Sequence, residues 1–588
     1  MHASPFFLLL ATSLSLVGQT SEIRTFRQWM GGQEVGGSST ETTQRGATRE
    51  ITSREWMVLS RLGQEIRQEI SQRAQKAPDG QLTFTWRLQL SSEPFEGKAE
   101  WSPRDPGALS IRPANGAAVR KSVPTAAILW PEELDAQLME AAKALRSVHA
   151  ITFNFPIQQW SSLELEPKGP SPLPGFPDAV RFAGQESEGA AKAAVEVWIS
   201  PTAGELRHRV DLGGLEVLTQ RSELPAPQPA KEPAAGFFEQ TLQKLPPHPF
   251  QPWMPEWILR AEGAQPDLPE DGQQTRLAGG RWRFRKAAPL TAAEAAQPPV
   301  KGAPAPGEAR YLAPTPLVPF QDPAFDGLLR RMALPPGLSR WDIAKRVNAF
   351  VFDWITEKDF TVGFASALEV AHHPRGDCTE HGVLAVALLR RLGVPARGVT
   401  GWVGLGEMLG LHFWVEVHLQ DRWVPIDPTF DQTPASALRI KLGDTDLSDL
   451  GSVGWDTAAT ALSGVRWTLE KAESLHIQGD QVSGPEGPRL QAKGGRWELK
   501  QGALYLRRGT GGPWRLQAVG RPGEAQLRGA SHLAGPRSLR RGWWQPASRL
   551  LWMDLGEGRW IQLEGVTESE AYNLLDLLDQ LATPAARS

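Results

Sequence analysis

The sequence predicts a multidomain α+β protein that is β-rich at both ends and has its clearest helices in the middle. Runs with a period of two, bounded by glycine and proline, mark residues 22–224 and 464–588 as mainly β. Two strongly apolar helical patterns lie within residues 309–445. Proline-rich stretches separate these regions. A chain of 588 residues, of which 40% are hydrophobic, is long enough to form several cores.

Charge and composition narrow the class of partner. The net charge is −3, so the sequence does not supply the concentrated basic face that nucleic acid binding requires, and no nucleic acid partner is expected. Twenty-three tryptophans stand against three tyrosines. This balance indicates Trp-rich β-domain cores, with a carbohydrate-stacking surface as the alternative.

Residues 1–19 are predicted to be a signal peptide. The apolar stretch of about a dozen residues that begins at Pro5 is too short to span a bilayer and is typical of a secretory h-region. It lacks a basic n-region, and Val17-Gly18-Gln19 is the best candidate for the cleavage site. We therefore expect a bacterial exported protein, periplasmic or secreted, with no transmembrane span in the mature chain. A misassigned start codon and a buried N-terminal strand are the alternatives.

Residues 22–224 are predicted to be a β-rich N-terminal domain with one helix. The segments Leu82–Leu90 and Val195–Ile199 alternate apolar and polar residues, as strands with one buried face do. Pro131 fits the first turn of the helix. We expect a curved antiparallel sheet crossed by this helix, whose apolar stripe consists of Leu134, Leu138, Ala141, Ala142 and Leu145.

Two proline-rich segments are predicted to be linkers. The first, Glu223–Pro233, is expected to be extended and semi-rigid. A small β segment at residues 237–290 follows, with a strand-like run at Arg281–Arg285. The second linker, Ala292–Glu308, is rich in alanine, proline and glycine.

The first clear helix of the central region, residues 309–445, is predicted to be capped by Ser339, with Asp342 three residues later. A second apolar helical pattern begins at Cys378 and ends before Gly393 and Pro395. The first helix is expected to pack against the second through Ile343, Val347, Phe350, Val351 and Trp354.

The C-terminal region, residues 464–588, returns to short strands such as Arg496–Leu499 and Ala503–Leu506. It is expected to end in a helix that opens at Thr567 and Glu570. The buried stripe of that helix is predicted to consist of Leu574, Leu575, Leu578 and Leu581.

Cys378, the single cysteine, is the candidate nucleophile. It lies at the first turn of a predicted helix, where the unpaired N–H groups and the helix dipole favour the reactive thiolate. One cysteine excludes an intrachain disulfide, and an unpaired thiol in an exported protein is easiest to explain if it is used. The alternative is an inert buried cysteine.

A histidine and an aspartate follow on two strand-like segments. His412 opens the first segment, and Asp427 lies in the second, after Trp423. Cysteine, histidine and aspartate can act as a nucleophile, its base and the residue that orients the base.

Four segments resemble the transglutaminase-like superfamily of papain-like cysteine enzymes. They read G-D-C-T-E-H-x-x-L from Gly376, L-G-V-P-A-R from Leu392, H-F-W-V-E-V from His412 and W-V-P-I-D-P-T-F from Trp423. The resemblance runs from about Tyr311 to Leu442, roughly a fifth of the chain.

This resemblance implies a papain-like transglutaminase core at residues 309–445 and acyl transfer from an amide through a thioester. It assigns Cys378 as nucleophile, His412 as general base and then general acid, and Asp427 as the residue that orients His412. The substrate expected is a protein or peptide, with the cell envelope as one source.

The residue before the nucleophile is Asp377, where animal transglutaminases commonly carry glutamine. This departure points to the microbial branch of the superfamily, so we favour hydrolysis of an amide or peptide bond. The alternatives are an amine-transferring protein-glutamine transglutaminase and a catalytically inactive binding or assembly protein of the cell envelope. Asp377 itself is expected to cap the helix, so that backbone N–H groups take up its charge.

No metal and no cofactor are expected. The histidines near the proposed triad show none of the usual metal-ligand spacings, and only one thiolate donor exists; they are His372, His373, His381 and His418. His381 is interpreted as a structural helix-face residue, and His418 is expected to lie on the His412 face of the strand, toward the cleft edge or solvent.

Two further features leave alternatives open. Asp431 is a second acid near Asp427, but Asp427 is preferred because an acid inside an apolar strand is costly unless it is paired. The glycine-rich segment Gly401–Gly406 is interpreted as a structural turn, with a mobile active-site loop as the alternative.

Overall fold

The computed structural model describes residues 22–61, 64–114, 118–188, 191–211, 216–223, 242–245, 256–357, 362–405, 408–448 and 450, and shorter stretches between 465 and 571. The predicted signal peptide, the first linker beyond Glu223, and the leucines predicted to form the stripe of the C-terminal helix lie outside these residues. The described chain is mostly β with a few helices, and its β-rich flanks agree with the predicted class. The predicted domain boundaries stay predictions.

The N-terminal region forms one antiparallel sheet of fourteen described strands, in the order β8-β7-β6-β5-β4-β3-β2-β1-β14-β13-β12-β11-β10-β9. Neighbouring strands in this sheet are consecutive in sequence, with one exception: the first strand, β1, pairs with the last, β14. The strands are β1 Glu22–Met30, β2 Gln33–Arg45, β3 Thr48–Arg61, β4 Gln64–Lys76, β5 Leu82–Gln89, β6 Phe95–Trp101, β7 Ala108–Pro113, β8 Val119–Ser122, β9 Val148–Asn154, β10 Gln159–Pro170, β11 Val180–Glu188, β12 Ala191–Ser200, β13 Gly204–Asp211 and β14 Glu216–Ser222.

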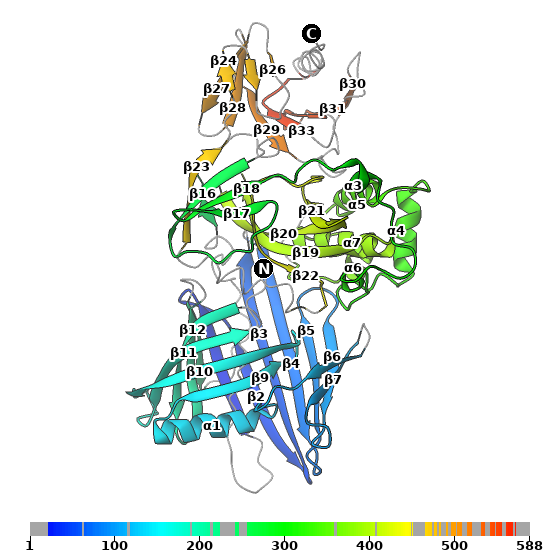
Figure 1. The fold of residues 1–588 in the computed structure, drawn as a ribbon. Helices are drawn as coiled ribbons and strands as arrows, with labels where there is room; N and C mark the ends of the chain where they lie inside the picture. The colour runs from blue at the N-terminus through cyan, green and yellow to red at the C-terminus, as the bar shows by residue number, and fades with distance from the viewer. Residues whose placement is uncertain are drawn as a thin grey trace.

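One helix, α1 (Pro131–Ala144), crosses this sheet as predicted and packs on β9, β12 and β13 (Figure 1). Four residues of the predicted stripe are buried: Leu134, Leu138, Ala141 and Ala142. The placement of Leu145 in the stripe was wrong, because its side chain is 50% exposed. Leu145 caps the helix in the left-handed conformation, with φ of 49°, and this turns its side chain away from the helix face.

The central region packs helices against a small sheet, and Figure 1 shows it above the N-terminal sheet. The sheet order is β15-β20-β19-β22, and β21 also pairs with β20, along residues 415–419. Helix α5 packs against α7 as predicted, and α7 also packs on β19 and β20. The elements are α3 Ala292–Ala296, α4 Ala324–Met332, α5 Arg340–Trp354, α6 Ala367–His372, α7 Cys378–Arg391, β15 Gln243–Lys244, β19 Ala396–Leu405, β20 Met408–Leu419, β21 Arg422–Ile426 and β22 Arg439–Thr445.

The predicted β segment at residues 237–290 joins two neighbours. Strand β15 pairs with β20 of the central sheet. Strand β18 (Arg281–Arg285), predicted with the same bounds, lies between β17 (Gln274–Leu277) and β16 (Glu256–Gly263). Strand β16 then pairs with β23 (Val465–Ala472), which belongs to the C-terminal part of the chain. The segment therefore joins the central and C-terminal regions.

The second predicted linker is packed against the central region. It contains the short helix α3, which Thr291 caps through a capping box with Glu294. At the end of this linker, Glu308 pairs with Arg340 of α5 at 2.8 Å. The remaining described strands form two C-terminal sheets: β24 His476–Gln478, β25 Gln481–Ser483, β26 Leu490–Gln491, and β27 Gly495–Lys500, β28 Ala503–Arg508, β29 Trp514–Val519, β30 Ser531–Ala534, β31 Arg541–Gln545, β32 Leu550–Asp554, β33 Trp560–Glu564.

A continuous cluster of buried apolar side chains links the N-terminal sheet to the central region. It includes Leu88 on β5 and Leu90 just after it, Phe364 before α6 and Leu384 on α7. Phe95 at the start of β6 packs against the same cluster. Among the described residues, none of the helices has both the length and the apolar character needed to cross a membrane.

Candidate active site

Helix α7 begins at Cys378 because the residues around it form a capping box. The Asp377 carboxylate accepts the Thr379 N–H at 2.9 Å, and the Glu380 carboxylate accepts the Asp377 N–H at 2.9 Å. The predicted capping role of Asp377 is therefore confirmed. Cys378 occupies the first helical position, and only 7% of its surface is exposed.

The glycine of the G-D-C segment is required by the packing of Glu380. Gly376 has φ of 133°, and an added Cβ would lie 2.3 Å from Cγ of Glu380. Glu380 is fully buried, and this burial, together with the charge of Asp377, raises its pKa to about 8. A buried carboxyl group with a raised pKa therefore underlies the start of α7.

Helix α7 and strand β20 lie alongside each other. Near the C-terminal end of α7, the Arg390 guanidinium donates to the carbonyl of Ala396, the β19 residue paired with Val417. Nearer its N-terminal end, a Cβ added to Gly382 would lie 2.4 Å from the Phe413 ring. The first contact is with β19 and the second with β20, and α7 packs on both strands.

The contact between Gly382 and Phe413 relates the start of α7 to β20. Cys378 lies one turn before Gly382 on α7, a rise of about 6 Å. His412 directly precedes Phe413 on β20. Cys378 therefore lies one helical turn from a residue that packs on the chain neighbour of His412.

His412 and Asp427 are in direct contact. His412 Nε2 lies 2.7 Å from Asp427 Oδ2, and the two residues are 3% and 0% exposed. Because Nε2 faces the carboxylate, Nδ1 is the nitrogen left to face a thiol. The imidazole lies near the rings of Trp414 and Phe430, whose centroids are 6.1 and 5.2 Å from its own.

Asp427 is fixed by more than His412. Its Oδ2 also accepts from Arg439 Nη2 at 2.5 Å, and its Oδ1 accepts the Thr429 N–H at 3.0 Å. The Asp427 N–H donates to the Gln432 carbonyl, and the Gln432 N–H donates to the Asp427 carbonyl. Burial alone would raise the pKa of Asp427, but the charges and hydrogen bonds of His412 and Arg439 outweigh it and hold that pKa well below its usual range.

Arg439 was missed by the sequence reasoning. It lies on β22, twelve residues after Asp427, and is buried. Besides Asp427, it donates to the Ser436 carbonyl at 3.0 Å and to the Gln432 side chain at 2.9 Å. No motif marks Arg439. The one available signal was that a buried acid such as Asp427 needs a partner, and a basic residue is the usual one.

The structure gives contacts for three other acids and histidines considered in the sequence: Asp431, His381 and His418. Asp431 accepts from Asn348 of α5 at 2.9 Å and has a positive φ of 49°. The buried His381 bonds through Nδ1 to the Asp377 carbonyl, a contact that supports its structural interpretation. His418 is half-buried and lies 2.9 Å from Glu308. Within the described ranges, His, Cys, Asp and Glu side chains form no group of three or more that could hold a metal ion.

The glycine-rich segment was interpreted as a turn or as a mobile loop, and over Gly401–Leu405 both interpretations were wrong. These residues belong to strand β19. Gly401 pairs with His412 on β20. A Cβ at Gly401 would lie 2.1 Å from the Ile440 carbonyl oxygen and 2.6 Å from the Trp414 ring. Glycine here lets three strands approach closely next to the proposed base.

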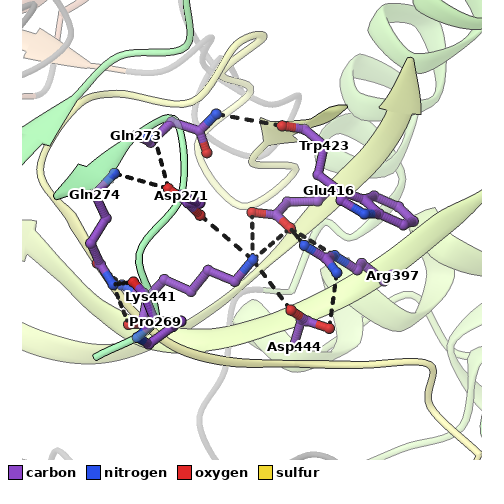
Figure 2. A network of polar contacts seen from close by, with 9 residues as sticks. All are labelled: Pro269, Asp271, Gln273, Gln274, Arg397, Glu416, Trp423, Lys441 and Asp444. Atoms are coloured by element: carbon purple, nitrogen blue, oxygen red, sulfur yellow. Dashed lines mark hydrogen bonds and ion pairs between the residues drawn. The ribbon is translucent and has the colours of Figure 1, made fainter. Parts of the chain in front are cut away.

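One polar network draws on three of the segments that resemble the transglutaminase-like superfamily, through Arg397, Glu416 and Trp423 (Figure 2). Glu416 pairs with Arg397 at 2.7 Å and with Lys441 at 2.9 Å, and Arg397 also pairs with Asp444 at 3.0 Å. The Arg397 guanidinium lies 4.1 Å from the centroid of the Trp423 ring. These contacts join β19, β20, β21 and β22, and His412 lies on β20 while Asp427 directly follows β21.

The same network anchors the segment before β17. Figure 2 shows Gln274 against Lys441, with the Lys441 N–H donating to the Gln274 side chain at 2.9 Å and the Gln274 amide donating to the Lys441 carbonyl at 3.0 Å. Asp271 lies 3.8 Å from the Lys441 ammonium. The small β segment is thereby fixed to β22, two residues from Arg439.

Comparison with protein families gives a match to part of the chain. Residues 333–428 match the model of the Transglutaminase-like superfamily. This segment is transglutaminase-like. The match includes Cys378, His412 and Asp427 and is the finding that supports a cysteine enzyme in general terms. Comparison with curated proteins gave no match.

Two solved structures resemble parts of the chain. A β-barrel-like protein of the domain of unknown function DUF1849 from Brucella abortus is 9% identical, with 36% of this chain and 100% of that chain covered, at a TM-score of 0.28. A "Putative Cysteine Protease" from Cytophaga hutchinsonii is 14% identical, with 45% and 93% covered, at a TM-score of 0.21. At these scores neither likeness assigns a fold or a function.

Proposed function

We propose that this chain is a cysteine enzyme with a papain-like core that cleaves amide or peptide bonds through Cys378, His412 and Asp427. The observation that carries the proposal is the buried 2.7 Å contact between His412 Nε2 and Asp427 Oδ2. Such a contact fixes the ring and stabilises the imidazolium that forms when the histidine takes a proton. The superfamily match over residues 333–428 supports the same assignment.

In the proposed reaction, Cys378 Sγ attacks the amide carbonyl carbon and its proton passes to His412 Nδ1. The tetrahedral intermediate collapses when His412 returns that proton to the leaving amine, and a thioester remains on Cys378. Water then attacks the thioester with His412 as base and releases the acid and the free thiol. The Cys378 N–H at the start of α7 is the candidate donor to the oxyanion.

We favour water over an amine as the acceptor. Transfer needs a site that excludes water and holds a neutral amine near the thioester. The chain has Asp377 where amine-transferring animal enzymes commonly have glutamine, and that residue is engaged as the helix cap. Export to the periplasm or the medium, proposed from residues 1–19, would dilute amine acceptors, and envelope proteins or peptides would then be within reach.

The test uses a set of activated peptide amides with and without a primary amine at millimolar concentration. Mass spectrometry of the products should show mainly the free acid, with Cys378→Ala and His412→Ala both inactive. A predominance of amine adducts would replace hydrolysis by transfer. Activity that survives Cys378→Ala would contradict the enzyme assignment itself.

A further inference from the structure

A loop of the N-terminal sheet reaches into the central region. It joins β5 to β6, and its serines bind the Glu369 carboxylate on α6. Ser91 Oγ donates to Oε2 at 2.6 Å, the Ser92 N–H donates to Oε1 at 3.0 Å, and the Ser92 hydroxyl donates to Oε1 as well. Glu369 is buried, so these three donors make up much of its polar environment.

The same loop fixes the segment that precedes α6. The Gly363 N–H donates to the Leu90 carbonyl at 2.9 Å, and an added Cβ at Gly363 would lie 2.7 Å from that oxygen. One residue later, the Phe364 ring lies 6.3 Å from the ring of Phe95 at the start of β6. The N-terminal sheet therefore holds residues 363–369 at both ends.

Ala365, between these two anchors, contacts the site. Its N–H donates to Glu380 Oε1 at 3.0 Å, while Glu380 Oε2 accepts the N–H of Asp377 at 2.9 Å. The Thr379 hydroxyl lies 3.0 Å from both oxygens. Glu380 thus links a segment held by the N-terminal sheet to the residue directly before Cys378.

We propose that Glu380 is a positioning residue for Cys378, and that the loop Leu90–Ser92 keeps it in place through Glu369 and the segment 363–369. The proposal rests on the proposed role of Cys378 as nucleophile. Acyl transfer is sensitive to placement, since an error of about 1 Å at a reacting group can cost roughly a hundredfold in rate. The N-terminal sheet then belongs to the catalytic unit.

The test compares the full-length double variant Ser91→Ala/Ser92→Ala with wild type in the rate at which iodoacetamide alkylates Cys378, measured from pH 5 to 9. We expect a fall of about tenfold in alkylation rate and in kcat, with a smaller change in KM. Ser91→Thr/Ser92→Thr keeps both hydroxyls and should keep the wild-type rate. Ser110→Ala, on an exposed position of β7, is the matched control and should also be unchanged.

Glu380→Gln gives a second and more severe test. Its amide nitrogen would face an N–H group, of Ala365 or of Asp377, that now donates to a Glu380 oxygen. The serine variant decides the question, since its changes lie on a partly exposed loop and should leave the thermal unfolding transition near that of Ser110→Ala. Alkylation and kcat equal to those of the control would overturn the inference. If wild type and His412→Ala were alkylated at the same rate, the proposed function would fail instead.

Discussion

Arg439 and His412 donate to the same oxygen of Asp427. Arg439 Nη2 lies 2.5 Å and His412 Nε2 lies 2.7 Å from Oδ2, and all three side chains are buried. A carboxylate between a guanidinium and an imidazole stays ionised to low pH, and its orientation is fixed from two sides. Asp427 is thereby held as a permanent anion beside the proposed base.

Replacing Arg439 should weaken the enzyme without removing the proposed triad. Arg439→Lys keeps the charge but loses the planar contacts to Gln432 and Ser436, and we expect kcat/KM to fall by about tenfold. Arg439→Gln also removes one of the two charges that lower the pKa of Asp427, the other being that of His412, so that pKa rises and the acid limb of the pH profile moves to higher pH. Arg346→Gln, exposed on α5, is the control; a profile in Arg439→Gln that matched it would contradict this role.

Cys378→Ala should abolish amide cleavage while the protein stays folded. The side chain lies at the first position of a helix that is capped by Asp377 and Glu380, so the loss of stability should be about 1–2 kcal/mol. Activity assays and thermal unfolding of the purified variant check both statements. An unfolded variant would mean that the thiol is chiefly a core residue.

His412→Ala should be as damaging as the loss of Cys378, whereas Asp427→Asn should leave measurable activity. Residues that act as a unit are strongly non-additive, and the orienting acid usually costs less than the base. Single-turnover rates with an activated amide would rank the three variants. A silent Asp427→Asn would mean that another acceptor orients His412, and Asp431, which accepts from Asn348, would then be the first acid to test.

The N-terminal sheet should lose stability as the pH rises above 6.5. Burial raises the pKa of Glu186 and of Glu205 to about 8, and the charge of Asp135 adds to the effect at Glu205. Between the usual value and 8, the folded chain keeps protons that the unfolded chain has released, so stability falls with pH. His208 lies 3.7 and 3.9 Å from these two acids, and its pKa, lowered by burial to about 4, has the opposite effect only below pH 6.5.

Denaturant unfolding at pH 6.5, 7.25 and 8 measures this trend. The free energy of unfolding of Glu186→Gln/Glu205→Gln should change less over this range than that of the wild type, because glutamine does not titrate. Glu164→Gln, a change of an exposed acid on β10, is the matched control and should follow the wild type. Parallel curves for wild type and the double glutamine variant would show that the two acids are not protonated in the folded state.

Local patterns in the sequence predicted several elements well. The alternation in Leu82–Leu90 gave strand β5, Pro131 opened α1, and Ser339 and Asp377 cap α5 and α7 as expected. Strand alternation and helix caps depend on residues that are close together in the sequence, so they can be read from a single sequence. The error at Leu145 arose because apolar spacing continues past the helix end, where the backbone has already turned into the left-handed region.

Contacts between distant segments could not be predicted in the same way. The pairing of β1 with β14 joins residues almost 200 positions apart, and a period of two does not specify which strand is the neighbour. The contact of Ser91 and Ser92 with Glu369 and that of Arg439 with Asp427 depend on the tertiary packing of unmarked residues. His412 and Asp427 were proposed as site residues because both lie in segments that resemble a known family.

The most direct test of the proposed chemistry is the pH dependence of Cys378 alkylation in wild type and in His412→Ala. A thiol at a helix start and paired with His412 should react rapidly with iodoacetamide well below the range in which a free thiol ionises, near 8.5. His412→Ala should shift that reactivity toward the free-thiol range and slow the reaction at neutral pH by at least tenfold. Identical profiles for the two proteins would contradict the assignment of Cys378 and His412 as nucleophile and base.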